Sequence, residues 1–218
     1  MLHSDADTLE DIIGDTTIVI PSKNEDPKYV EIIKERAKCP VIVIKDKLYG
    51  EAIKEGVRQA STRYILTMDA DGQHTYQEAE RLANMFDVMG PDMLIGERRQ
   101  KGRNFIRAFA SLVLNCCASV FSGRWVVDLN SGMRIFRRDL AISYEEILCD
   151  NFSYTTSIAM SFLADGHNVE WSPILVNDRK EGKSHVKPVK DGLRTLYYII
   201  RIGFALRTRG LRKLLRWR

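Results

Sequence analysis

The sequence predicts an α/β protein with a mostly parallel central sheet flanked by helices. Short apolar runs with the composition of buried strands lie at residues 16–20, 41–44, 64–68 and 92–96. Between them, apolar residues recur at helical spacing over 27–38, 50–60 and 75–89. This alternation of strand and helix is typical of a parallel sheet with helices on both faces. The run Val41 to Ile44 is apolar throughout, as expected for a strand buried on both faces.

The second half of the chain continues with longer helices. We predict helices over 103–121 and 153–164, and strands over 133–136 and 169–176. One or two basic amphipathic helices are expected at the C-terminal end. The chain is therefore divided into a main domain at 1–186 and a basic amphipathic tail at 187–218.

Composition and charge limit the classes of protein. The 218 residues are 44% hydrophobic and 28% charged, which fits one globular domain with a sizeable core. Residues 187–218 hold ten Lys or Arg and one Asp, which gives +9 there and, against the total of +4, −5 for residues 1–186. A basic tail on an acidic body points to an anionic partner for the tail.

Targeting and redox features are sparse. The acidic start of the chain does not resemble a signal peptide, and the longest apolar run, 108–121, is too short and polar to span a bilayer, so neither is expected. Cys39, Cys116, Cys117 and Cys149 form no C-x-x-C pair, which predicts reduced and mostly buried thiols. Trp125 and Trp171 are expected to be packing residues.

An acidic motif follows the third predicted strand. Asp69 and Asp71 belong to the sequence Asp-Ala-Asp-Gly-Gln-His and come directly after an apolar run that ends at Met68. Ligands of open α/β sheets bind at the carboxyl ends of the strands. Carboxylates there favour hard cations such as Mg²⁺ or Mn²⁺, which commonly carry phosphate oxygens. The motif indicates an enzyme that acts on a nucleotide diphosphate; the alternative is two solvated loop acids.

The sequence does not fit three other motifs that bind metals or phosphates. An EF-hand loop needs glycine at its sixth position, where His74 stands, and aspartyl phosphatases have Thr or Val where Gln73 stands. The sequence around Gly182 lacks the earlier glycine of a P-loop, because Asn177 occupies that position. Phosphates are therefore expected to be held by a metal and side chains.

These segments together resemble family 2 glycosyltransferases, in the branch of polyprenyl- or dolichyl-phosphate mannose synthases. The resemblance is carried by residues 18–25, 68–74, 96–98, 128–134 and 178–184. It covers roughly 16–196, and its specificity comes from the order and spacing of the motifs. It implies a GT-A fold, a nucleotide-sugar donor, an Mg²⁺ or Mn²⁺ cofactor and a polyprenyl or dolichyl phosphate acceptor, with no nucleic acid partner.

The resemblance also assigns residues to roles. The nucleotide sugar would be lined by Pro21, Ser22, Asn24, Glu25, Asp46, Asp69, Ala70 and Asp71. The metal would be surrounded by Asp69, Asp71 and Gln73, and the acceptor phosphate by Arg98, Ser131, Arg179 and Lys183. The catalytic residues would be Asp69, Asp71 and Asp128. For the basic residues, the alternative is a solvated surface.

The sequence departs from the family pattern at several positions. Lys45-Asp46-Lys47 replaces the usual paired acids and glycine, and Leu129 replaces a proline. Base and sugar therefore stay open between GDP-mannose, the favoured donor, and others such as UDP-glucose. His74 is either a member of the site or a loop histidine.

The implied reaction is an inverting displacement at the anomeric carbon. A lipid phosphate is largely ionised at neutral pH, since its second pKa is about 6, so no strong general base is required, although Asp128 could assist. Two other classes stay open: a family 2 transferase with a saccharide or soluble acceptor, and a non-enzymatic protein whose basic tail binds RNA or membrane.

The tail carries an apolar stripe followed by a basic cluster. The stripe consists of Val189, Leu193, Leu196, Tyr197, Ile200 and Phe204, and the cluster of Arg207, Arg209, Arg212, Lys213, Arg216 and Arg218. The favoured reading is a helix in the headgroup layer of an anionic membrane, which would hold the enzyme peripherally at the cytoplasmic face. The alternatives are a terminal helix packed on the domain and an RNA-binding tail.

Overall fold

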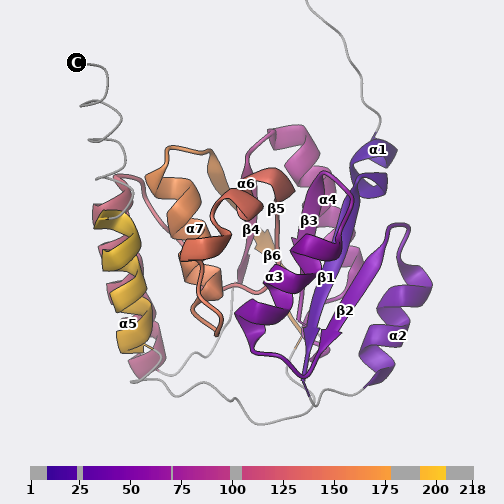
Figure 1. The fold of residues 1–218 in the computed structure, drawn as a ribbon, viewed down its shortest axis with the longest axis horizontal. Coiled ribbons are helices and arrows are strands. Elements are labelled where there is room, and N and C mark those ends of the chain that lie inside the picture. The colour runs from indigo at the N-terminus through magenta and orange to yellow at the C-terminus, as the bar shows by residue number, and fades with distance from the viewer. Residues whose placement is uncertain (1–8, 24–26, 70, 99–104, 178–191, 205–218) are drawn as a thin grey trace, which may run out of the picture.

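The structure, a computed structural model, describes residues 9–23, 27–69, 71–98, 105–177 and 192–204. One six-stranded sheet forms its centre (Figure 1). Its strands are β1 (Thr16–Ser22), β2 (Val41–Lys45), β3 (Tyr64–Thr67), β4 (Met93–Arg98), β5 (Arg134–Arg137) and β6 (Val169–Ile174). They lie in the order β2-β1-β3-β5-β4-β6, and only β5 runs antiparallel to its neighbours. The predicted mostly parallel sheet is confirmed.

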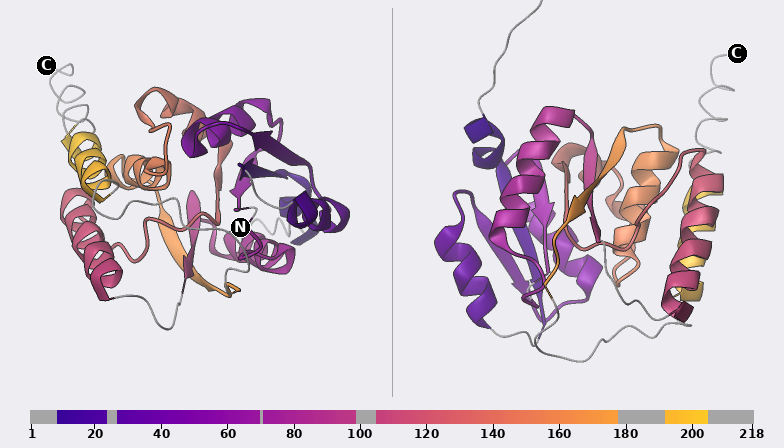
Figure 2. Two further views of the ribbon diagram at one scale, coloured as in Figure 1. Left: turned by 90° about the horizontal axis from the view of Figure 1, so that it is seen from below. Right: turned by 180° about the vertical axis from the view of Figure 1, so that it is seen from behind.

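Helices cover both faces of this sheet, as predicted (Figures 1 and 2). The labelled helices are α1 (Leu9–Gly14), α2 (Pro27–Arg36), α3 (Tyr49–Gln59), α4 (Tyr76–Met89), α5 (Phe105–Ser122), α6 (Arg138–Ser143) and α7 (Tyr154–Ala164), with a 3₁₀ turn at Glu145–Ile147. A further helix spans 192–204 and lies beside α5. Helices α3, α6 and α7 lie on one face of the sheet, and α1 and α4 on the other. The short helices α1 and α6 were not predicted.

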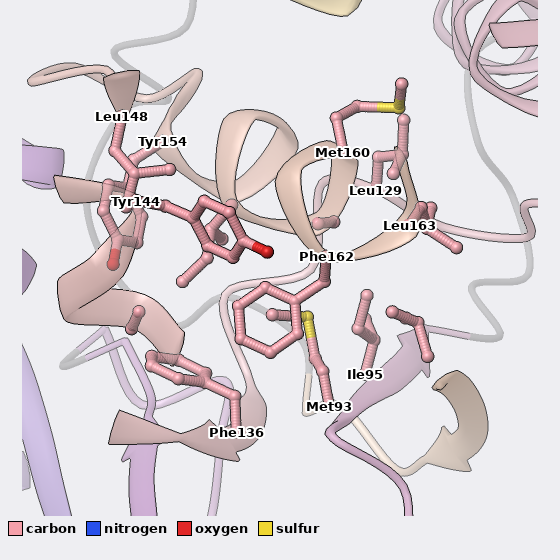
Figure 3. Close-up of a cluster of buried hydrophobic side chains, with 14 of the residues drawn as sticks. Met93, Ile95, Leu129, Phe136, Tyr144, Leu148, Tyr154, Met160, Phe162 and Leu163 are labelled. Atoms are coloured by element: carbon pink, nitrogen blue, oxygen red, sulfur yellow. The ribbon is translucent and has the colours of Figure 1, made fainter. Parts of the chain in front are cut away.

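The core consists of two apolar layers separated by the sheet. Alternate side chains of β1 enter different layers, because Val19 packs with α3 and α7, whereas Ile18 and Ile20 pack with α2 and α4. In the first layer, Phe162 of α7 meets Phe136 of β5 with ring centroids 6.4 Å apart (Figure 3). Burial on both sides explains why β1 is an almost continuous apolar run.

Three strand predictions need correction. β2 is an edge strand of the sheet. Ile42 packs against the first apolar layer and Val41 and Val43 against the second, but only Ile44 is buried, so the expected burial on both faces is incomplete. β1 extends past the predicted run at 16–20 to Ser22, with Pro21 paired opposite Ile44. The run of parallel strands is interrupted by β5, which inserts between β3 and β4.

Helix 192–204 packs on α5 through residues that lie outside the apolar stripe. Thr195, Ile199 and Ile202 are buried, and Gly203 lies against the ring of Phe121 of α5. Four members of the predicted stripe are exposed instead: Leu193, Tyr197, Ile200 and Phe204. Val189 and residues 205–218 lie outside the described residues. Among the helices that the structure describes, none has the length and apolar character needed to cross a bilayer.

Two smaller predictions were tested as well. All four cysteines are free, but only Cys149 is buried, and Cys116 is exposed, so the expectation of mostly buried thiols was wrong. Trp171 packs against the core, as expected, and its indole N–H donates to the carbonyl of Asp128 at 3.0 Å. Trp125 is 76% exposed and is not a packing residue.

Candidate functional site

The candidate site lies at one edge of the sheet. β1 and β3 are parallel, so Ser22 at the end of β1 and Asp69 after β3 come to the same edge. β5 runs the other way, and its first residue, Arg134, pairs with Thr67 and Ile95 near the ends of β3 and β4. The loop that precedes β5 therefore meets the acidic motif at this edge.

Asp69 is held by groups from three other segments. Its Oδ1 accepts a hydrogen bond from the Tyr49 hydroxyl at 3.1 Å, and its Oδ2 lies 3.7 Å from Nε2 of His74. Gly132 lies against the carboxylate so closely that an added Cβ would collide with both of its oxygens. The Thr67 hydroxyl donates to the Gly132 carbonyl at 2.7 Å and fixes this approach. The carboxylate side chain is 32% exposed, which leaves part of it open to a ligand.

The surroundings of Asp69 favour its ionised form. Burial raises the pKa of Asp69, but the interactions with His74, Arg98 and Tyr49 outweigh burial, so the pKa is lowered overall. His74 is itself buried, and its Nδ1 has no partner among the described residues. Of the two readings of His74, the structure supports membership of the site.

Asp71 lies in a tight turn directly after Asp69. Its Oδ1 accepts the backbone N–H of Gln73 at 3.1 Å. Gly72 has φ +76, and a Cβ there would come within 2.7 Å of the Tyr29 ring, so the turn requires glycine. The backbone N–H of Asn177 donates to the Gln73 carbonyl at 3.0 Å, which brings the chain after β6 to this turn.

The donor set of this turn fits a divalent cation. Two carboxylates at the edge of the sheet are hard oxygen ligands of the kind that Mg²⁺ and Mn²⁺ prefer. Within the described part of the chain, no three His, Cys, Asp or Glu side chains cluster to hold an ion by themselves. Asp69 and Asp71 therefore fit an ion whose remaining ligands would be phosphate oxygens and water.

Arg98 and Asp128 form an ion pair across the site. Nε of Arg98 lies 3.3 Å from Oδ2 of Asp128, and Nη2 lies 3.5 Å from Oδ1. Oδ1 of Asp128 also accepts the backbone N–H of Asn130 at 2.9 Å. The pair joins the end of β4 to the loop before β5 and presents a guanidinium, 21% exposed, at the edge of the site.

Arg134 anchors the same loop from inside. It is 1% exposed, and its guanidinium donates to the carbonyls of Leu129, Ser131 and Thr155. Burial lowers the pKa of Arg134 from its usual value. Sequence reasoning missed this residue, although an arginine at the start of an apolar strand is the signal that could have identified it.

The remaining predicted residues differ in how they are placed. Ser131 is fully buried, and its hydroxyl turns inward to the Met133 carbonyl at 3.4 Å, so its position does not fit contact with an acceptor. Pro21 is buried, and Ser22 lies at the end of β1. Asp46 is exposed with φ +58, and its N–H donates to the Ser22 carbonyl at 3.2 Å. Other predicted residues lie outside the described ranges: Asn24, Glu25, Ala70, Arg179 and Lys183.

Comparison with solved structures defines the fold class. The structure superposes on glucosyl-3-phosphoglycerate synthase from Mycobacterium tuberculosis, solved with Mn²⁺, UDP-glucose and phosphoglyceric acid, with a TM-score of 0.65. The match covers 93% of this chain and 86% of the synthase at 12% sequence identity. Mannosyl-3-phosphoglycerate synthase from Rubrobacter xylanophilus matches with a TM-score of 0.61, 16% identity and coverage of 94% and 80%. The fold is therefore the GT-A fold of nucleotide-sugar transferases.

The sequence itself identifies the family. Residues 14–144 match the profile of Glycosyl transferase family 2, and the chain belongs to this family. The hexosyltransferase Agl6 of low-salt glycan biosynthesis in Haloferax volcanii is 28% identical over 203 residues, 88% of this chain. Polyprenol monophosphomannose synthase of Mycolicibacterium smegmatis is 31% identical over 129 residues, 55% of this chain. The chain spans about half the length of these two relatives, 47% and 48%.

Proposed function

We propose that the chain is a glycosyltransferase that moves a sugar from a nucleotide-sugar donor to a polyprenyl phosphate. The observation that carries the proposal is the Asp69 carboxylate at the edge of the sheet, with Asp71 two residues further on and Gly132 of the loop before β5 packed against it. The names of Agl6 and polyprenol monophosphomannose synthase support sugar transfer and a polyprenol acceptor.

On the donor side, Asp69 and Asp71 would hold Mg²⁺ or Mn²⁺ against the diphosphate. When bound, the cation would neutralise charge that develops on the leaving diphosphate. Ser22 and Asp46, which are joined by a backbone hydrogen bond, would line the nucleotide. The proposed donor is GDP-mannose, and UDP-glucose is the second candidate.

On the acceptor side, Arg98 would bind the acceptor phosphate by charge-assisted hydrogen bonds. Asp128 holds the Arg98 guanidinium in place through the ion pair at 3.3 Å. Arg179 and Lys183 would add positive charge on the acceptor side. They follow Asn177 in the chain, and the Asn177 N–H donates to the Gln73 carbonyl in the acidic turn. A phosphate that is already ionised can attack the anomeric carbon directly and invert it, without a strong base.

The test is an assay of purified protein with radiolabelled donor sugars and Mn²⁺. GDP-mannose and UDP-glucose are each offered with a polyprenyl phosphate, with 3-phosphoglycerate and with a free saccharide. We expect label in the lipid fraction, as the inverted anomer, and none when EDTA exceeds the metal. Turnover that persists in EDTA, or transfer only to the soluble acceptors, contradicts the proposal.

The same assay separates donor from acceptor residues. Replacing both Arg179 and Lys183 by Ala should raise the polyprenyl phosphate concentration that gives half-maximal rate, while donor affinity measured by calorimetry is retained. The double variant Lys28→Ala, Lys34→Ala on α2 removes equal charge and serves as the control. An equal loss of donor affinity contradicts the acceptor assignment.

We further propose that the tail meets an anionic membrane surface. Large apolar side chains are exposed on α5, on the loop after it and on helix 192–204: Leu112, Val113, Val120, Trp125, Leu193, Tyr197, Ile200 and Phe204. The two helices lie side by side (Figure 2), and Phe121 and Phe204 have ring centroids 6.2 Å apart. Beyond them the sequence carries six basic residues in 207–218, each adding about 1 kcal/mol near an anionic surface.

Liposome sedimentation tests this surface. Full-length protein should sediment with anionic vesicles, less at high salt, and removal of residues 207–218 should release it. Equal binding to neutral and anionic vesicles, or no binding by the intact chain, contradicts the proposal.

A further inference from the structure

Tyr49 links the acidic motif to a distant part of the fold. It is the first residue of α3, and its hydroxyl donates to Oδ1 of Asp69 at 3.1 Å. Its ring stacks on Phe152, with centroids 5.2 Å apart and planes at 23°. The family resemblance had assigned no role to either aromatic residue.

The start of α3 is fixed to the segment before α7, so the Tyr49 hydroxyl has a defined place. A Cβ on Gly50 would collide with the Cys149 carbonyl, which shows how closely the two backbones approach. The backbone N–H of Glu51 donates to the Asp150 carbonyl at 3.0 Å, and Lys54 forms an ion pair with the Asp150 carboxylate. These contacts keep Tyr49 in position independently of Asp69.

The chemistry of Tyr49 suits a permanent donor. A tyrosine hydroxyl has a usual pKa of about 10, so it keeps its proton at neutral pH and can only donate to a neighbouring carboxylate. A hydroxyl that donates to one carboxylate oxygen limits rotation of the carboxylate and leaves its other lone pairs for a ligand. Hydrogen bonds of this kind behind a metal ligand typically change metal affinity by about 10–100-fold.

We propose that Tyr49 is a positioning residue that orients the Asp69 carboxylate for the complex of a divalent cation with a nucleoside diphosphate. Phe152 supports it by fixing the plane of the ring. The proposal rests on the proposed function of Asp69, because it assigns Tyr49 to the same binding event. In this role Tyr49 would act through the Asp69 carboxylate, to which its hydroxyl donates.

Calorimetry on the full chain tests this role with GDP and UDP as probes, with and without Mn²⁺. Tyr49→Phe removes the hydroxyl and keeps the stacked ring. We expect the Kd for Mn²⁺ in the presence of nucleotide to rise about tenfold, while metal-free nucleotide affinity is unchanged. Phe152→Leu should raise the same Kd by a smaller factor. Tyr197→Phe, at an exposed position on helix 192–204, is the matched control and should bind as the wild type does.

The outcomes separate this inference from the proposed function. If Asp69→Asn abolishes Mn²⁺ binding while Tyr49→Phe binds as the wild type does, the role of Tyr49 is wrong and that of Asp69 stands. If Tyr49→Phe loses metal-free and metal-dependent affinity equally, its role is structural and the inference is overturned. If the wild type itself shows no metal-dependent nucleotide binding, the proposed roles of Asp69 and of Tyr49 are both wrong. If the melting temperature of Tyr49→Phe is far below that of the wild type, Phe152→Leu becomes the test of the inference. An unchanged Mn²⁺ affinity in Phe152→Leu then overturns it.

Discussion

The two segments that meet at the site are held in opposite ways. The turn after β3 presents the Asp69 side chain, which is fixed at its own oxygens by the hydrogen bond from Tyr49 and the contact with His74. The loop before β5 is fixed through its backbone, because the buried guanidinium of Arg134 donates hydrogen bonds to the carbonyls of Leu129 and Ser131. A side chain that must bind a ligand needs partners that leave part of it exposed. A loop that only lines the site can have its backbone held by a buried side chain.

The largest expected effect comes from removing a ligand-facing carboxylate. Asp71→Ala should lower the rate of sugar transfer at least 10²-fold, the scale of losing one electrostatic contact in the transition state. Asp87→Ala, near the far end of α4, removes an equal charge and should leave the rate within a factor of two, about 0.4 kcal/mol. A similar loss in both variants would show that net charge matters and the position does not.

The second effect tests the loop that is held from inside. Arg134→Met should lower the free energy of unfolding by about 2 kcal/mol, because buried carbonyls lose their charged donor. Arg137→Met lies on the same strand but is 38% exposed, and should cost under about 1 kcal/mol. Urea denaturation measures both. Equal values would mean that the Arg134 hydrogen bonds contribute nothing beyond those of a surface arginine.

The third effect acts where the two segments touch. Gly132→Ala places a methyl group against the Asp69 carboxylate, which can turn away, so the fold should survive. We expect about a tenfold loss of Mn²⁺-dependent nucleotide affinity, comparable to disturbing a group behind a metal ligand. Gly14→Ala has open space around the added methyl and serves as the control. Unchanged affinity in Gly132→Ala would show that the loop does not control Asp69.

The smallest effect concerns the helix that continues the acidic turn. Glu78 of α4 accepts the Leu175 N–H at 2.9 Å and pairs with Arg81. Burial raises the pKa of Glu78, but Arg81 and the Leu175 N–H outweigh burial and lower it below its usual 4.5. The stability from this depressed pKa is present above the unfolded-state value and is lost as the pH falls through the lower, folded-state value.

The measurement for Glu78 is the unfolding free energy of wild type and Glu78→Gln as a function of pH. The wild type should be more stable by about 1 kcal/mol at neutral pH. The difference should shrink only below pH 4.5, the usual pKa of Glu. Glu35→Gln removes an exposed carboxylate from α2 and serves as the control for the loss of one negative charge. A difference that is constant with pH would show that the ionised carboxylate is not the stabilising form.

Much of the fold and part of the site could be predicted from local sequence. The apolar runs marked the strands because burial on both faces requires them, and the position of Asp69 and Asp71 after β3 followed from strand order along the chain. Two features that the sequence did not predict concern the pairing of strands in the sheet. The edge position of β2 and the insertion of β5 depend on which strands are neighbours in space, and the apolar content of a run carries no information on that.

The sequence by itself determined the family, the α/β alternation and the acidic turn, because each is written in residues close together along the chain. Only the tertiary structure decided what holds Asp69. Tyr49 lies 20 residues before it, and the Gly132 loop joins Thr67 across 65 residues, so no local pattern reports either contact. It also decided that Ser131 turns inward and that the stripe of helix 192–204 faces outward. The physical reason is that a side chain's environment is set by its neighbours across the sheet, and these are fixed only when the strands pair.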